Sequence, residues 1–247
     1  MTIPPESELG PEQPIIAHLI ELRSRLLKVV AVVLLAFLGL APFADRLYTY
    51  LAGPLLKHLP EGGRMIAIDV ASPFLTPFKL ALVVAIFGTM PFTLYQVWAF
   101  VAPGLYRHEK RLLLPLLAAS TVLFYLGGAF AYLVVLPLVF QFMTATAPQG
   151  VAVMTDISRY LDFILTLFFA FGVAFEVPIA TILLVWSGIT TRAALAAKRP
   201  YVIVAAFVIG MVLTPPDVIS QTLLAVPMWF LYELGLLFCR PFERSTI

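Results

Sequence analysis

Two glutamates, Glu21 and Glu109, each lie in a short polar stretch that borders a long run of apolar residues. Residues 100–111 hold Glu109 beside three basic residues, and the stretch around Glu21 is also basic. A carboxylate in such surroundings can accept a two-pronged hydrogen-bonded pair from an incoming guanidinium group. The alternative is a solvated carboxylate that only offsets its basic neighbours. If folding brings the two glutamates together, they form a site for two cations.

A third glutamate, Glu176, lies near the middle of an apolar run, in the stretch 171–178. An acidic group at membrane depth costs about 2.5–3.5 kcal/mol on insertion scales, so it is expected to face a cavity or a partner. The alternative is a structural hydrogen bond to another helix, with the proton retained. A fourth acidic residue, Asp217, follows two prolines and precedes an apolar run, which is typical of a helix N-cap.

The composition is that of a protein with several membrane spans. The chain has 247 residues, of which 61% are hydrophobic and 12% charged, with a mean hydropathy of +0.98. A soluble domain is about 45–50% apolar and about 25% charged. The single cysteine excludes an internal disulfide, and the histidines show no metal-ligand spacing. No catalytic motif is apparent, so we predict no enzyme, cofactor or metal, and a net charge of +2 gives no reason to expect nucleic acid.

The apolar runs predict an all-α polytopic membrane protein with six transmembrane helices. We expect a disordered cytoplasmic tail at 1–14, a single membrane domain at 15–240 and a cytoplasmic tail at 241–247. No cleavable signal peptide is apparent, so the first run is expected to remain as an anchor. The predicted spans are residues 26–43, 75–98, 112–136, 161–186, 201–214 and 219–238.

The first span is preceded by residues 18–27, whose leucines recur at helical spacing. This pattern predicts an amphipathic helix at the membrane surface. Glu21 and Arg25 lie four residues apart on its polar face, where a solvated ion pair would contribute a few tenths of a kcal/mol.

Several local signals predict where other helices begin and end. Residues 45–63 are long for a connector and predict a small cap on the outer face, in which Pro54 breaks a helix. Ser72 and Pro73 predict a helix start, and Asp156 predicts an N-cap. Pro137 is expected to close the third span.

The basic residues predict the orientation of the chain. With six spans, eleven of the sixteen Lys and Arg residues fall on one side, which indicates that both termini are cytoplasmic. The fifth span is short, because the residues before Thr214 cover only about 20 Å against the roughly 30 Å hydrocarbon core. The last two spans therefore either thin the bilayer or pack behind longer helices.

Four sequence patterns occur in a fixed order along the chain. They are His18-Leu-Ile-Glu-Leu-Arg23, Phe100-x-x-Pro-x-Leu-Tyr-x-x-Glu109, Phe171-Gly-x-x-Phe-Glu-x-Pro178, and Lys198-Arg-Pro-Tyr201 followed by Thr214-Pro-Pro-Asp-Val-x-Ser-Gln221. In this combination the chain resembles the TatC family, the multi-spanning receptors of the twin-arginine protein translocase, over residues 15–240. The one departure is minor: the loop reads Glu-Lys-Arg where Glu-Arg-Arg also occurs. The resemblance implies a concave, glove-shaped bundle.

The resemblance also implies a function. It implies that the chain binds twin-arginine signal peptides of folded proteins at the cytoplasmic face of the bacterial plasma membrane. The positions that match the family's signal-binding region are Glu21, Arg23, Phe100, Pro103, Leu105, Tyr106 and Glu109.

Further implications concern partners. Glu176 matches a membrane-embedded acid, which the family places on the concave face. Met211, Thr214 and Gln221 match positions linked to the single-span partners TatA and TatB. The resemblance also implies self-association into a multi-copy complex and transport driven by the proton-motive force.

Three other function classes compete with this interpretation. A proton-coupled small-solute transporter would use Glu176 as its proton carrier and be indifferent to Glu21 and Glu109. An intramembrane hydrolase would need a paired nucleophile and base, and none is evident. A purely structural scaffold would leave the two inner-surface glutamates dispensable.

Overall fold

The computed structural model describes residues 12–56, 66–101, 110–145, 156–213 and 218–239. This part of the chain is built from helices, with one isolated β-bridge between Ile66 and Asp156. The all-α prediction is therefore confirmed. The elements in order are α1 (Glu12–Leu40), η2 (Ala41–Phe43), α2 (Ala44–Leu56), α3 (Ser72–Gly88), α4 (Met90–Val101), α5 (Lys110–Phe130), η4 (Ala131–Val135), α6 (Leu136–Ala145), α7 (Ile157–Phe175), α8 (Val177–Trp186), α9 (Arg192–Ala197), α10 (Arg199–Leu213) and α11 (Val218–Phe238).

The first helix is one continuous element. α1 runs without a break from Glu12 to Leu40, so the prediction of a separate amphipathic helix at 18–27 is wrong. No proline or glycine falls between residues 15 and 38, and nothing in the sequence interrupts the backbone hydrogen bonds where the polar turns meet the apolar ones. At 1.5 Å per residue, the 29 residues of α1 cover about 43 Å, more than a hydrocarbon core.

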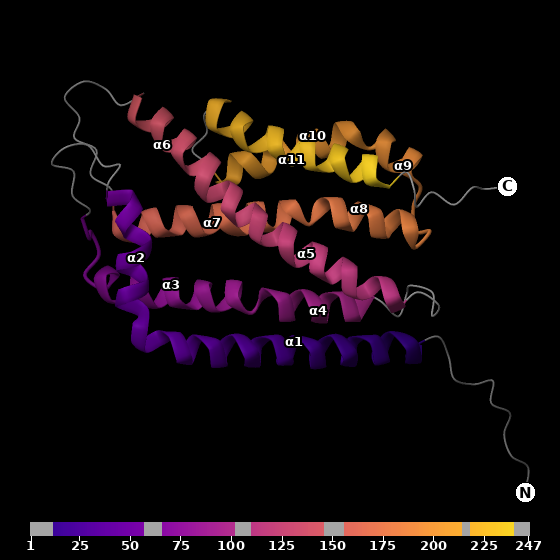
Figure 1. Ribbon diagram of the computed structural model, residues 1–247, viewed down its shortest axis with the longest axis horizontal. Coiled ribbons are helices and arrows are strands. Elements are labelled where there is room, and N and C mark those ends of the chain that lie inside the picture. The colour runs from indigo at the N-terminus through magenta and orange to yellow at the C-terminus, as the bar shows by residue number, and fades with distance from the viewer. Residues whose placement is uncertain (1–11, 57–65, 102–109, 146–155, 214–217, 240–247) are drawn as a thin grey trace, which may run out of the picture.

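α2 crosses the end of the bundle opposite the start of α1 (Figure 1). Leu47 and Tyr48 of α2 pack against a buried cluster formed by Leu80 of α3 and two leucines of α7. The helix continues through Pro54 to Leu56, so the prediction that this proline breaks the helix is wrong. Near a helix end, proline removes one backbone hydrogen bond, and the final turn persists here without it.

The second predicted span is a bent pair of helices. α3 begins at Ser72 with a proline at the start of its first turn, as predicted. α3 and α4 meet at an angle of 52°. The hydroxyl of Thr89 donates to the carbonyl oxygens of Ala85 (2.8 Å) and Ile86 (3.2 Å), and Pro91 lacks an N–H group. Both features disturb the regular backbone ladder at the bend.

α5, η4 and α6 form one long apolar segment, so Pro137 does not close the third span as predicted. The five residues of η4 form a π-helix, in which the N–H group of Leu136 donates to the carbonyl oxygen of Ala131. This wide turn accommodates the proline that follows, and the helix continues to Ala145. The segment crosses α7 diagonally in Figure 1.

α7 begins at the predicted N-cap. One oxygen of the Asp156 carboxylate accepts from the N–H groups of Ser158 (3.0 Å) and Arg159 (2.9 Å). The other accepts from the N–H group of Ile68 (3.0 Å), which ties the segment before α3 to α7. These backbone donors, with Arg159 the strongest, hold the pKa of Asp156 below its ordinary value.

The last two helices form a short hairpin. α10 has 15 residues and covers about 22 Å. In Figure 1 the end of α10 and the start of α11 stop short of the end of the bundle at which α2 lies. Gly235 allows α11 to approach α8 closely, because a Cβ atom there would lie 2.2 Å from the hydroxyl oxygen of Thr181.

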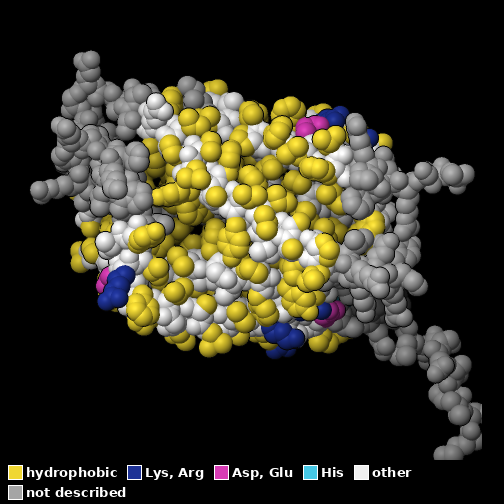
Figure 2. All heavy atoms as spheres, in the orientation of Figure 1, with side chains coloured by type: hydrophobic (Ala, Val, Ile, Leu, Met, Phe, Trp, Pro, Cys, Tyr) yellow, Lys and Arg dark blue, Asp and Glu magenta, His cyan; other side chains and the backbone are white. Residues whose placement is uncertain are grey.

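The surface fits a membrane environment. In the described part, four helices are long and apolar enough to cross a membrane, and the bent pair α3–α4 makes a fifth if it is counted as one span. α10 is a shorter apolar helix. Apolar side chains cover the visible face, and the charged side chains lie toward its margins (Figure 2).

Close packing of α5 on α7 gives a first prediction. A Cβ atom at Gly127 would lie 2.4 Å from the backbone oxygen of Phe171, whereas one at Gly128 would only touch the Phe87 ring at 3.4 Å. We expect Gly127→Ala to destabilise the protein by about 1–3 kcal/mol, as overpacked cores do, and Gly128→Ala to change stability little. Thermal unfolding in detergent measures both, and equal melting temperatures would show that α5 and α7 separate easily.

Candidate functional site

A polar cluster lies where α1 and α4 pack together. The guanidinium of Arg25 donates from Nε (2.9 Å) and Nη2 (2.7 Å) to a single oxygen of Glu21, Oε1. Its remaining nitrogen, Nη1, donates to the side-chain oxygen of Gln96 at 3.1 Å. Gln96 is buried on α4, with 6% of its surface exposed. The helical (i, i+4) pair predicted from the sequence is therefore present, and it is also anchored to a second helix.

Glu21 remains accessible in this arrangement. Its side chain is 36% exposed, and the described residues give Oε2 no hydrogen-bond partner. The side chains of Arg23 and Lys28 are exposed on the same helix and form no ion pair within the described part. The cluster therefore offers a partly exposed carboxylate among several positive charges, with one oxygen that no described residue bonds.

An aromatic contact lies beside the cluster. The ring of His18 on α1 stacks on Phe100 of α4, with centroids 4.2 Å apart and planes inclined by 21°. The Arg25–Gln96 hydrogen bond and the His18–Phe100 contact thus bring the start of α1 and the end of α4 together. The other predicted members of this site, Pro103, Leu105, Tyr106 and Glu109, lie outside the described residues.

A second polar network lies deeper in the bundle. Glu176 occupies the junction between α7 and α8, and its N–H group bonds back to the Val173 carbonyl oxygen at 3.0 Å. Its Oε2 atom accepts from the hydroxyl of Ser120 on α5, and that hydroxyl accepts from the indole N–H of Trp98 on α4 at 3.1 Å. A hydrogen bond between Glu176 and another helix, one of the two alternatives raised by the sequence, is therefore present.

The network leaves one polar atom without a partner. Glu176 Oε1 is buried and has no hydrogen-bond partner within the described part of the chain. A buried acceptor of this kind is costly unless a donor reaches it. Glu176 is thus both a structural acceptor and a group with unused hydrogen-bonding capacity.

The hairpin residues differ from one another in exposure. Met211 of α10 is 53% exposed, as a surface for partner helices requires. Gln221 of α11 instead donates from its amide to the backbone oxygen of Phe207 at 2.8 Å, which ties α11 to α10. Thr214 and Asp217 lie outside the described residues.

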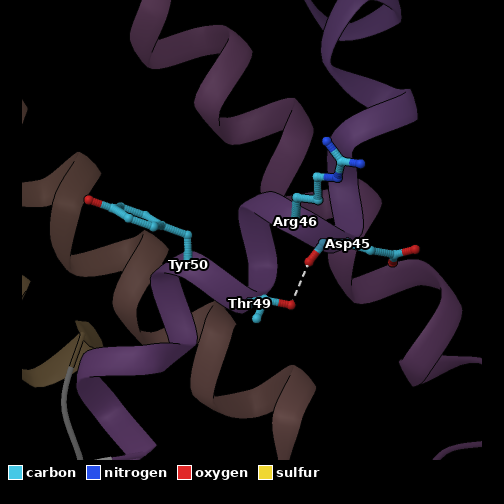
Figure 3. A pocket seen from close by; sticks show the side chains of 4 residues that line it. All are labelled: Asp45, Arg46, Thr49 and Tyr50. Atoms are coloured by element: carbon cyan, nitrogen blue, oxygen red, sulfur yellow. Dashed lines mark hydrogen bonds between the residues drawn. The ribbon is translucent and has the colours of Figure 1, made fainter.

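Two other features bear on chemistry. An open hollow of about 570 Å³ lies on α2, lined by Asp45, Arg46, Thr49 and Tyr50, in which the Thr49 hydroxyl donates to the Asp45 carbonyl oxygen at 2.8 Å (Figure 3). It lies at the end of the bundle away from Glu21. The described residues contain no group of three or more His, Cys, Asp or Glu side chains that could hold a metal ion.

Sequence reasoning missed three members of these networks: Gln96, Trp98 and Ser120. Each is an ordinary residue in an apolar run, and its partner lies 22 to 71 positions away. A polar residue at an inward helix position was the available signal, but it did not identify the partner.

Ser120 gives a second prediction. It is fully buried, and Ser120→Ala leaves both the Trp98 indole and the Glu176 carboxylate without their shared partner. We expect a loss of about 1–3 kcal/mol in unfolding free energy. Ser187→Ala is the matched control, because its exposed hydroxyl donates to the Leu184 backbone oxygen of its own helix and has no other partner within the described residues. Thermal unfolding of both variants tests this, and a Ser120→Ala protein as stable as the control would contradict it.

The chain is similar in sequence to known proteins over most of its length. The family model described as Sec-independent protein translocase protein (TatC) matches residues 17–227. The TatC protein of Azotobacter chroococcum is 61% identical over 238 residues, covering 96% of this chain and 92% of that protein. The Escherichia coli K12 TatC protein is 58% identical over 228 residues, covering 92% and 88%.

A solved structure shows the same fold. A crystal structure described as the twin-arginine translocase receptor TatC is 39% identical, with a TM-score of 0.82 over 91% of this chain and 99% of that chain. The chain therefore belongs to the TatC family, as a multi-pass membrane component of a Sec-independent protein translocase and not an enzyme.

Proposed function

We propose that this chain is the receptor that binds the twin-arginine signal peptides of folded proteins, with Glu21 as one of its guanidinium ligands. The observation that carries the proposal is the half-exposed Glu21 carboxylate, whose Oε2 atom has no partner among the described residues. The name of the crystallised relative, a twin-arginine translocase receptor, supports the same function. Arg23, Pro103, Leu105, Tyr106 and Glu109 complete the proposed site by their match to the family's motifs.

The chemistry of the cluster suits a peptide with two adjacent arginines. A carboxylate and a guanidinium form two parallel hydrogen bonds in a fixed plane, whereas a lysine ammonium binds as a point charge. Phe100, half-buried at the end of α4, offers apolar surface for the hydrophobic residue that follows the arginines.

The proposed site lies at the cytoplasmic face of a bacterial plasma membrane. The starts of α1 and α5 and the ends of α4, α8 and α11 lie at one end of the bundle (Figure 1). Arg23 and Lys28 of α1 and Arg192 and Lys198 at the two ends of α9 lie toward the same end of the bundle (Figure 1). Basic residues concentrate on the cytoplasmic side of membrane proteins, which supports cytoplasmic N- and C-termini.

Binding of a labelled signal peptide tests the site. We expect a twin-arginine peptide to bind the full chain in inverted membrane vesicles, and a twin-lysine peptide to bind at least about tenfold more weakly. Glu21→Gln removes the charge while keeping the shape, and is expected to weaken arginine-peptide binding by a similar factor. Glu233→Gln is the matched control, because Glu233 lies on α11 and, among the described residues, pairs with Arg199 alone.

Two results would contradict the receptor proposal. One is equal binding of both peptides to the unaltered protein with no effect of Glu21→Gln. The other is binding to right-side-out vesicles alone, which would reverse the proposed orientation.

We further propose that the α10–α11 hairpin and Glu176 contact single-span partner helices, TatA and TatB, in a multi-copy complex driven by the proton-motive force. The short α10 helix fits partners whose own spans are short, and the exposed Met211 offers a contact surface. The unpartnered Glu176 Oε1 atom can accept from a polar group of a partner helix or from water.

Substitutions on the hairpin test the partner surface. We expect Met211→Trp to reduce co-purification of TatA and TatB about fivefold, as loss of an interface residue worth about 1 kcal/mol would. Leu35→Trp is the control, since Leu35 is 69% exposed on α1, which packs on α3 and α4 at the other side of the bundle from the hairpin (Figure 1). Unchanged co-purification of TatA and TatB with Met211→Trp would show that the hairpin is not part of the interface. Cargo export that continues after a protonophore is added would show that the proton-motive force does not drive transport.

A further inference from the structure

We propose that Arg25 is a resident competitor of the signal peptide: its guanidinium occupies Glu21 when no peptide is bound and must release that carboxylate when a peptide arginine arrives. The proposal rests on the proposed function of Glu21 as a ligand of the signal peptide. It adds a residue that sets how tightly the peptide binds.

The geometry of the ion pair carries the inference. Arg25 directs two N–H groups, from Nε and Nη2, to the same carboxylate oxygen, Oε1. An incoming guanidinium needs both oxygens of Glu21 to form a two-pronged pair. Oε2 has no hydrogen-bond partner among the described residues, but Oε1 is held by Arg25, so the full contact forms only when Arg25 gives up Oε1.

A second ion pair in the same chain shows the arrangement that Arg25 lacks. Arg199 of α10 donates from Nε to Glu233 Oε1 (2.6 Å) and from Nη2 to Glu233 Oε2 (2.8 Å), so both carboxylate oxygens are used. That pair is a complete fork that joins α10 to α11. The Glu21–Arg25 pair is incomplete, and one oxygen stays accessible to a second donor.

Gln96 gives Arg25 a place to remain after release. Its side-chain oxygen accepts from Nη1 of Arg25, and it is buried on α4. A guanidinium that loses Glu21 therefore keeps one hydrogen bond to the neighbouring helix and is not expelled into an apolar environment. The cost of displacing Arg25 is limited to its bonds with Glu21, which suits a competitor that yields to the peptide.

Removal of Arg25 is expected to strengthen peptide binding. Partly exposed ion pairs of this kind are weak, so Arg25→Gln should lower the Kd of a twin-arginine peptide by about two- to fivefold. Fluorescence anisotropy with a labelled peptide and the full-length protein in nanodiscs measures the change. A twin-lysine peptide should gain less, because an ammonium binds as a point charge and can use Oε2 without displacing Arg25 from Oε1.

Lys28→Gln is the matched control for charge. Lys28 is exposed on the same helix, three residues after Arg25, and forms no ion pair with Glu21. It removes one positive charge without freeing Glu21 Oε1, so it is expected to change the Kd by less than Arg25→Gln does. A gain with Lys28→Gln as large as with Arg25→Gln would show that charge alone acts, and would overturn the proposal.

A double variant links the gain to Glu21. Once Glu21 is replaced by Gln, Arg25 has no carboxylate to protect, so Glu21→Gln with Arg25→Gln should bind no more tightly than Glu21→Gln alone. An equal gain in both backgrounds would overturn the proposal. So would weaker or unchanged peptide binding by Arg25→Gln, which would make Arg25 a support for Glu21.

The Arg25 variants also lose the hydrogen bond to Gln96, so thermal unfolding of each variant measures whether the fold is kept. If Arg25→Gln does not fold, Arg25→Lys takes its place in the binding experiment, because a lysine ammonium keeps the charge but lacks the planar pair of donors. Arg25→Lys should also tighten peptide binding. Unchanged or weaker binding would overturn the proposal.

Failure of the receptor function itself has a different signature: the unaltered protein would bind twin-arginine and twin-lysine peptides alike, and Glu21→Gln would have no effect.

Discussion

A polar group inside an apolar bundle has no water to bind, so it needs a hydrogen-bond partner within the protein. In this structure such pairs link neighbouring helices. The buried hydroxyl of Ser120 on α5 satisfies Trp98 of α4 and the carboxylate of Glu176 at once. Gln96, also on α4, accepts from Arg25 of α1. Because both connections pass through α4, this short helix joins the polar cluster on α1 to the junction between α7 and α8. A displacement of α4 would therefore alter the surroundings of Glu21 and Glu176 together.

The same constraint applies where the backbone of the long helices becomes irregular. The α3–α4 bend has the Thr89 hydroxyl bonded to backbone oxygens, and the α7–α8 junction has Glu176 bonded to Ser120. In each case a proline follows within two residues, and the polar side chain lies beside the irregular backbone. At the third irregular position, the π-helix η4, the backbone compensates alone through the bond from Leu136 to Ala131. Breaks in apolar helices persist because donors and acceptors are supplied locally.

The sequence predicted the helical class and several helix starts because these depend on nearby residues. Hydropathy indicated the apolar helices, and the side chains of Asp156 and the Ser72–Pro73 pair marked the starts of α7 and α3 as expected. The predictions at Pro54 and Pro137 failed because a proline's cost depends on whether neighbouring turns can adjust. The contacts of Gln96 and Ser120 were out of reach for another reason. Their partners lie 71 and 56 positions away, and tertiary packing alone brings them together.

The Glu21–Arg25 spacing shows how one sequence pattern gains meaning from its surroundings. Four residues apart on a helix, such a pair is ordinary and weak. The hydrogen bond from Arg25 to Gln96 makes this pair different, because Arg25 can leave Glu21 and still keep a partner on α4. If Glu21 receives peptide arginines, a receptor also has to release them after each cargo. A resident guanidinium serves that need: it returns to the carboxylate as the peptide leaves, so the site never exposes an uncompensated acid at the edge of the membrane.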